Sequence, residues 1–155
     1  MSDLQLITKP DSYNRASSGA IWGSATLKVG EEFFPSIDWD DLVVAFAVSW
    51  LHAIVQIARH ESPSERVHFM DGPFMADFEN VEGKIVVDLV ESGVKGEISR
   101  YHLIADTRNL LANAASIAEE ILRECHKHNW RDKDITMLNK LKQEVQSILN
   151  DFIRE

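Results

Sequence analysis

Residues 74–91 read FMADFENVEGKIVVDLVE and carry the clearest structural signal in the chain. Phe74, Ala76 and Phe78 alternate with other side chains, and the alternation resumes after Asn80–Gly83, a segment of turn-forming residues. An apolar residue at every second position is typical of a β-strand with one face in the core. The stretch therefore predicts two antiparallel strands joined by a turn.

The β pattern continues beyond both ends of this hairpin. A β region begins near Val67 and Phe69, and residues 97–104 form the last strand after a turn at residues 92–96. Three β segments at about ten-residue spacing are typical of an antiparallel meander. Residues 21–29 also alternate, so we expect this strand to join the same sheet.

The N-terminal part of the chain lacks such a period. Residues 10–19 are turn formers, and we expect residues 1–19 to be a flexible, loop-like segment. The segment has neither the basic start nor the long apolar centre of a signal peptide. Cys125 is the single cysteine, which excludes an intramolecular disulfide and suits a reducing compartment. These features together predict a cytoplasmic protein.

Leu42–Ala58 is a run of 17 residues without a formal charge, and it is apolar on nearly every helical face. A helix that is apolar all round is surrounded by the rest of the protein. Asp38 is its expected N-cap, and Asp40 and Asp41 are expected in its first turn, where negative charge interacts favourably with the helix dipole. A membrane span needs about 20 apolar residues, so we expect no membrane association.

Two further helices are expected after the meander. Residues 107–128 carry a broad apolar stripe, and residues 130–134 form a linker. The last helix has apolar residues at three- and four-residue spacing, namely Leu138, Leu141, Val145, Ile148 and Phe152. Two heptads are too few for an independent coiled coil, so we expect this helix to dock on the domain and the protein to be a monomer rather than a homodimer. The predicted fold is a single α+β domain over residues 1–155, with an antiparallel meander packed against a buried central helix and two C-terminal helices.

The charge of the chain is unevenly distributed. The 155 residues carry a net charge of −9, and the stretch from Glu31 to Glu97 holds 14 acids against 4 lysines and arginines. Direct nucleic-acid binding requires clustered cations, so we expect none. A carboxylate-rich surface speeds the encounter with a cationic partner. The alternative is a solvated face that only aids solubility.

Alternation along the two hairpin strands puts several carboxylates on the face opposite the core, and acids in the turns lie beside it. Trp22 shares its strand face with polar residues, which makes it a candidate interface anchor. The candidate contact residues for a protein partner are Asp77, Glu79, Glu82, Asp88, Glu91 and Trp22.

No strong catalytic or cofactor motif is present. The segment Cys125–His128 resembles a metal-binding cluster, but residues two apart on a helix diverge, so a basic helix end is the better interpretation and no metal is expected. The Glu82–Lys84 triplet resembles a nuclease element but falls in a predicted turn. His52 lies within the buried helix and is interpreted as a hydrogen-bonded core residue, since no nucleophile elbow accompanies it.

Several segments together show a family pattern. The chain contains VGEEFFP at 29–35, then WDD at 39–41 opening the apolar helix, then FMDGPF at 69–74. Over roughly residues 20–130 this pattern resembles the immunity proteins of bacterial polymorphic and contact-dependent growth inhibition toxin systems. The resemblance implies a non-catalytic protein, without a cofactor, that binds and neutralises a cognate toxin domain acting in the cytosol, often a basic nuclease. It carries no binding residue over by position.

A function of another class stays open beside this one. The alternative is a small-molecule-binding protein or small enzyme with a pocket near His52, Trp50 and His102.

Overall fold

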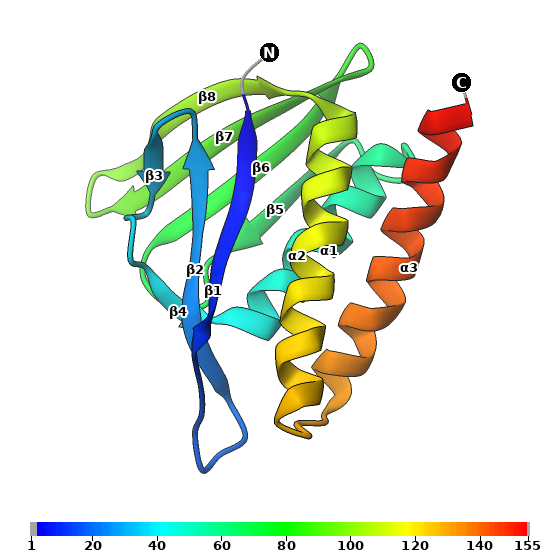
Figure 1. Ribbon diagram of the computed structural model, residues 1–155. Helices are drawn as coiled ribbons and strands as arrows, with labels where there is room; N and C mark the ends of the chain where they lie inside the picture. The colour runs from blue at the N-terminus through cyan, green and yellow to red at the C-terminus, as the bar shows by residue number, and fades with distance from the viewer. Residues whose placement is uncertain (1–2, 155) are drawn as a thin grey trace.

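The computed structural model describes residues 3–154, in which two four-stranded antiparallel sheets pack with three helices (Figure 1). The elements in chain order are β1 (Leu4–Arg15), β2 (Ile21–Val29), β3 (Glu32–Phe34), β4 (Asp40–Leu42), α1 (Val43–Ala58), β5 (Ser64–His68), β6 (Phe74–Val81), β7 (Lys84–Gly93), β8 (Gly96–Ala105), α2 (Thr107–Lys127) and α3 (Lys133–Arg154). The predicted single-domain α+β class is confirmed. Among these described residues, no helix combines the length and the apolar character needed to cross a membrane.

Sheet A contains β5, β6, β7 and β8 in that order. The predicted alternation is confirmed, because Phe78, Val87 and Leu103 lie in one cross-strand row and are all buried. The meander has four strands rather than three, because the β region expected near Val67 forms a strand of its own. Ser64–His68 forms β5, although only one of its five side chains is buried, because β6 and α1 supply pairing and packing that the local sequence does not reveal.

Sheet B contains β1, β2 and β3, with β4 pairing to the same edge of β2 as β3. The expectation that residues 21–29 join the meander was therefore wrong. That strand instead pairs with β1, where Leu6 lies opposite Leu27. Two sheets form because β2 pairs with β1, β3 and β4, which all lie within the first 42 residues. The strands of the meander begin only at Ser64, so pairing with them would close a longer loop.

The prediction that residues 1–19 are loop-like was also wrong, since β1 begins at Leu4 and ends at Arg15. Residues 1–2 lie outside the described residues. Leu4, Leu6 and Thr8 alternate into the core, but the pattern covers only three buried positions before polar residues follow. The pairing shifts between Lys9 and Asn14, so turn-forming residues are accommodated in an irregular stretch of the strand.

The start of α1 differs from the prediction. Asp38, Asp40 and Asp41 do not cap the helix: Asp40–Leu42 forms β4, and α1 begins at Val43 without a side-chain cap. Asp38 instead accepts a hydrogen bond from Lys9 at 2.8 Å. The β4 strand prevails over the local helix-start signal because it pairs with residues 22–24 of β2.

Asp41 connects the two sheets and is fully buried. Its carboxylate accepts hydrogen bonds from the backbone N–H groups of Leu42 (2.7 Å), Met70 (3.1 Å) and Asp71 (3.4 Å), and from the Trp39 indole (2.9 Å). Met70 and Asp71 belong to the loop between β5 and β6. Because burial removes the carboxylate from water, its pKa is raised, and the four donors oppose that shift. Asp41 therefore ties β4 of sheet B to a loop of sheet A.

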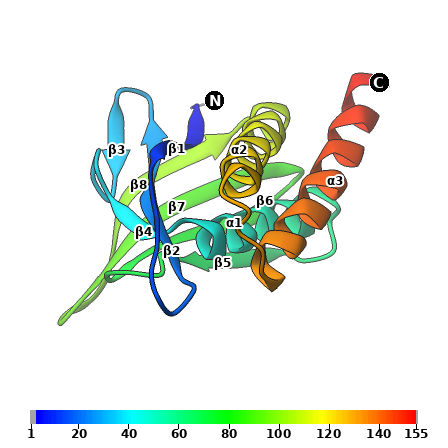
Figure 2. The ribbon, with the colours of Figure 1, turned by 60° about the horizontal axis from the view of Figure 1, so that its bottom comes forward.

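Helix α1 lies between the sheets and the other helices (Figure 2). The prediction that protein surrounds it is nearly correct, since Phe46, Trp50 and Ile54 are fully buried. One stripe at helical spacing is nevertheless accessible and includes Ser49 and His52. The remaining helices are confirmed: α2 is capped by Asp106, and α3 docks through Leu138, Leu141, Val145 and Ile148, all buried.

Candidate functional site

The outer face of sheet A is the side turned away from the helices and sheet B (Figures 1 and 2). One residue from each strand forms a charged row across it. Arg66 of β5 lies opposite Asp77 of β6, Asp77 opposite Asp88 of β7, and Asp88 opposite His102 of β8. Two carboxylates thus lie side by side in the middle, an arrangement that repels unless cations flank it.

Arg66 flanks the row on one side and binds two carboxylates with the forked geometry of a guanidinium. Its Nε and Nη2 donate to Asp77 at 2.6 and 2.8 Å, and its Nη1 and Nη2 donate to Glu97 at 2.7 and 2.8 Å. These hydrogen bonds raise the pKa of Arg66 above its ordinary value and lower the pKa of Glu97. Arg66 therefore remains charged and is fully occupied by partners of its own chain.

Asp88 is held on the other side of the row. Its Oδ1 accepts a hydrogen bond from the Ser99 hydroxyl at 2.9 Å and lies 2.8 Å from His102 Nδ1. Serine and histidine both contact the carboxylate and not one another, so the group lacks the serine–histidine bond that a nucleophilic triad requires. The three residues position one another on an open sheet face.

The outer face is curved along one diagonal. The Arg66–Glu97 pair joins β5 to β8 and so passes over β6 and β7. Met75 and Val90 alternate onto this face, yet each is only 5% exposed. Next to them lies an open hollow of about 550 Å³ lined by Ser64, Glu65, Arg66, Asp77, Phe78, Glu79 and Asp88.

Two predicted contact residues form no ion pair among residues 3–154, and both lie toward the β6–β7 turn. Glu79 is exposed on β6, and Glu82 is exposed in the turn itself. Glu82 and Gly83 have φ values of 53° and 83°, the geometry of a two-residue type I′ turn. Glutamate rarely adopts a left-handed backbone, and Asn or Gly is favoured there. An exposed charged residue in this unfavourable backbone conformation is a candidate functional position.

The remaining predicted contact residues lie elsewhere. Glu91 follows Leu89 onto the inner side of β7 by alternation, and it accepts a hydrogen bond from Arg100 at 3.1 Å. Trp22 is half-buried on sheet B, opposite Asn14 and Leu42. The structure thus groups Asp77, Glu79, Glu82 and Asp88, and it separates Glu91 and Trp22 from them; their role in binding stays a prediction.

The interpretation of His52 as a core residue was wrong. Its side chain is 58% exposed and lies 4.0 Å from Glu65. The exposed stripe of α1 places it there, while Trp50, two residues earlier on the helix, is fully buried and packs on Phe78. Trp50 and His52 therefore do not line one pocket, and His102 lies on the outer face of sheet A.

The C-terminal end of α2 has the predicted basic character, with His126 and Lys127 in its last turn. His128 stacks on Trp130 and lies 3.1 Å from Glu124. Burial raises the pKa of the Cys125 thiol to about 11, so this thiol is inert at neutral pH. Within residues 3–154, no three His, Cys, Asp or Glu side chains converge as a metal site would require.

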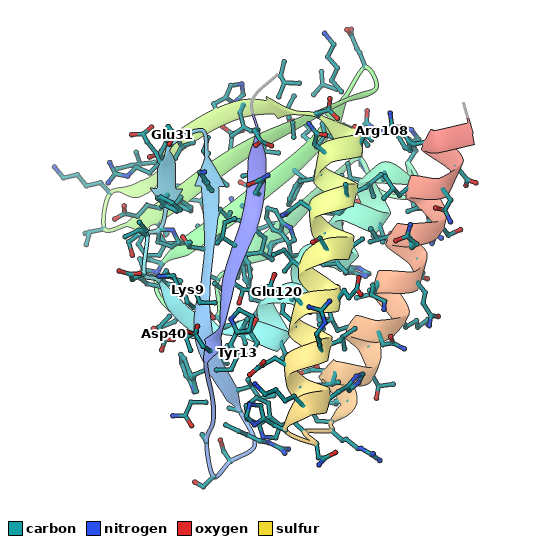
Figure 3. All side chains as sticks on the ribbon, in the orientation of Figure 1. Lys9, Tyr13, Glu31, Asp40, Arg108 and Glu120 are labelled. Carbon is teal, nitrogen blue, oxygen red and sulfur yellow. The ribbon has the colours of Figure 1, made fainter. Side chains whose placement is uncertain are left out.

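Other titratable groups lie at the junction of β1 and α2, where Figure 3 labels Tyr13 and Glu120 on the two elements. Burial raises the pKa of both groups. The Tyr13 hydroxyl is 2.5 Å from Thr8 Oγ1, so its hydrogen-bonding partner is internal. Both groups lie where β1 and α2 pack against one another.

Comparison of the chain with protein-family models, with curated proteins and with solved structures finds no match. The candidate role of the outer face of sheet A therefore depends on the geometry described above and on no relative. Sequence reasoning missed Arg66, Glu97 and Ser99, and it named His102 only for a pocket near His52 and Trp50. A signal was present, because the Glu82–Gly83 turn fixes a register that sets Asp77 opposite Asp88, and such a pair requires nearby cations.

Proposed function

We propose that this protein is a non-catalytic immunity protein that binds and neutralises a cognate toxin domain through the outer face of sheet A. The observation that carries the proposal is the pair of exposed carboxylates at Glu79 and Glu82, which form no ion pair among residues 3–154 and lie beside a row whose Asp77 and Asp88 are already hydrogen-bonded within the chain. The partner expected for such a surface is a basic, nuclease-like domain.

The charge balance of sheet A supports this proposal. Residues 64–105 contain eight carboxylates against four lysines and arginines. Arg66 and Arg100 are engaged by carboxylates of their own chain. A cationic partner that approaches this face thus meets excess negative charge.

The test uses isothermal titration calorimetry against the product of the adjacent upstream gene, which is the candidate toxin, in a catalytically inactivated form. We expect tight one-to-one binding by the unchanged protein. The double variant Glu79→Gln, Glu82→Asn should weaken binding about tenfold or more, which corresponds to about 1.4 kcal/mol. The matched control is Glu31→Gln, Glu32→Gln, which removes two exposed carboxylates from the β2–β3 turn and the start of β3.

Stability separates binding from folding in this experiment. Asn suits the left-handed backbone at position 82 better than Glu, so Glu82→Asn should raise the melting temperature while it weakens binding. Equal loss of affinity in the control double variant would mean that only the net charge matters. Absence of binding by the unchanged protein would refute the proposed function.

A further inference from the structure

The long edge strands of the two sheets, β1 and β8, differ in whether their outward backbone groups are hydrogen-bonded. On β1 the N–H of Leu6 donates to the Asn113 side-chain oxygen at 2.8 Å, and the Asn113 amide donates back to the Leu6 carbonyl at 3.2 Å. Helix α2 thereby takes the place of a neighbouring strand. On β8, no strand or helix among residues 3–154 pairs with the edge turned away from β7.

The free edge of β8 is long and accessible. Its first five residues, from Gly96 to Arg100, are all exposed, and Ile98 is 52% exposed. The other edge strand of sheet A, β5, has five residues and packs against α1. An exposed row of unpaired backbone groups of this length is a template for one more strand.

The backbone direction at this edge follows from the hairpin. Val94 and Lys95 form a two-residue loop closed by Gly93 and Gly96. In such a hairpin the closing pair is hydrogen-bonded, and bonded and non-bonded pairs alternate from there. The N–H group of Ser99 therefore points away from β7, toward the free edge.

The side chains beside this edge have two characters. Glu97 and Ser99 face outward, where Ser99 donates to Asp88 and Glu97 accepts from Arg66, whereas Ile98 and the half-buried Tyr101 lie on the inner side. A strand added here would place alternate residues beside carboxylates and beside apolar side chains. A second copy of this chain does not match, because it would bring its own Glu97 and Asp88 to the same junction.

We infer that β8 is a docking edge for an extended segment of the partner protein in which cationic and apolar residues alternate. The inference deepens the proposed function, on which it rests for the nature of the partner. The added segment becomes a fifth strand of sheet A, with its cations on the acidic outer face and its apolar residues against Ile98 and Tyr101. Backbone hydrogen bonds to β8 give the added strand its affinity, and the alternation of cationic and apolar side chains fixes its register.

The probe is a nine-residue peptide of alternating lysine and valine, capped at both ends and titrated into the isotope-labelled full chain. We expect saturable changes in the amide resonances of residues 96–102. A peptide of the same composition with lysines and valines in separate blocks should bind about tenfold more weakly, because it cannot match both faces. Changes confined to Glu79 and Glu82, or equal binding of the two peptides, would overturn the inference.

Ser99 offers a matched pair of variants. Ser99→Pro removes the outward N–H, whereas Ser99→Ala keeps it and removes only the hydroxyl bonded to Asp88. We expect Ser99→Pro to weaken peptide binding about tenfold and Ser99→Ala to leave it within about twofold. If Ser99→Pro is folded, as judged by its melting temperature, and binds normally, the edge is not the site.

A third variant guards against a folding defect in Ser99→Pro. Ile98→Glu keeps every backbone group and should weaken binding of the alternating peptide, while Val94→Glu at the hairpin tip should not. Sedimentation equilibrium of the free protein tests the other occupant, since a dimer abolished by Ile98→Glu would assign the edge to a second copy and overturn the inference. Binding of the peptide without binding of the toxin domain would refute the proposed function alone.

Discussion

Strands β1 and β8 are the long edge strands of the two sheets, and the rest of the chain treats them in opposite ways. β1 is covered by α2, and one asparagine satisfies both backbone groups of Leu6. β8 is exposed along its first half. Charged residues at positions 97 and 100 and an irregular register near Ser99 are the features that keep a free edge from pairing indiscriminately. The comparison shows that the edge of β1 is covered through one specific residue, Asn113. The edge of β8 has no such residue, and its exposed length makes it a candidate binding edge.

The largest effect is expected from a change at Asp41, which joins sheet B, the sheet with the covered edge, to sheet A. Asp41→Ala removes the acceptor of four hydrogen bonds and leaves buried donors without partners. We expect a loss of about 3 kcal/mol or more in the free energy of unfolding, measured by urea titration. Asp40→Ala, an exposed neighbour on β4, should change it by no more than about 0.5 kcal/mol. Equal effects would mean that Asp41 does not hold the two sheets together.

The second test uncovers the edge of β1 directly. Asn113→Leu keeps the size of the side chain but leaves the N–H and carbonyl of Leu6 unpaired. We expect a loss of about 2 kcal/mol and faster hydrogen exchange at the Leu6 amide, measured by mass spectrometry. Asn109→Leu, an exposed site four residues earlier on α2, is the control. Unchanged exchange at Leu6 would show that packing alone covers the edge.

A smaller effect is expected from the ion pairs on the open sheet. Arg66→Met removes the bonds to Asp77 and Glu97, which are partly solvent-exposed, so the melting temperature at neutral pH should fall by only a few degrees. Arg100→Met, which breaks the single pair with Glu91, is the matched control. A loss as large as that of Asn113→Leu would contradict the view that sheet A depends little on its outer face.

Arg66→Met should also change how the melting temperature depends on pH in the acidic range. The pKa of Glu97 is lowered in the folded protein, mainly by the hydrogen bond from Arg66. A carboxyl of this kind stabilises the fold above its ordinary pKa and loses that contribution as the pH falls through the lowered value. Melting temperatures between about pH 5 and 3 should therefore fall more steeply for the unchanged protein than for Arg66→Met. Parallel curves would mean that Glu97 gains nothing from Arg66.

The smallest effect is expected in amide hydrogen exchange, which compares β1 with β8 in the unchanged protein. Amide hydrogen exchange in the free protein should be faster at Ser99 than at Leu6, because only Leu6 has a partner on its outward side. Addition of the alternating peptide should slow exchange at Ser99 and leave Leu6 unchanged. Equal protection of the two amides in the free protein would remove the distinction between the edges.

The strongest sequence patterns predicted their elements well. Phe74, Ala76 and Phe78 marked β6, and the spacing from Leu138 to Ile148 marked the buried side of α3, since in both cases the apolar period is long enough to stand out. The candidate contact residues were placed less well. Asp77 and Asp88 share a face as predicted, but their partners Arg66 and His102 come from strands whose register the local sequence does not show.

The sequence by itself determined the α+β class, the alternating faces of the meander, the two C-terminal helices and the negative charge of the central segment. These features depend on periodicity and composition, which are local properties. Only the tertiary structure decided that β2 leaves the meander for a sheet of its own, that Asp41 is buried between the sheets rather than capping α1, and that β1 is covered while β8 is free. The burial of Asp41 and the covering of β1 depend on contacts between residues 29 to 107 positions apart, and such contacts are selected by the packing of the whole chain.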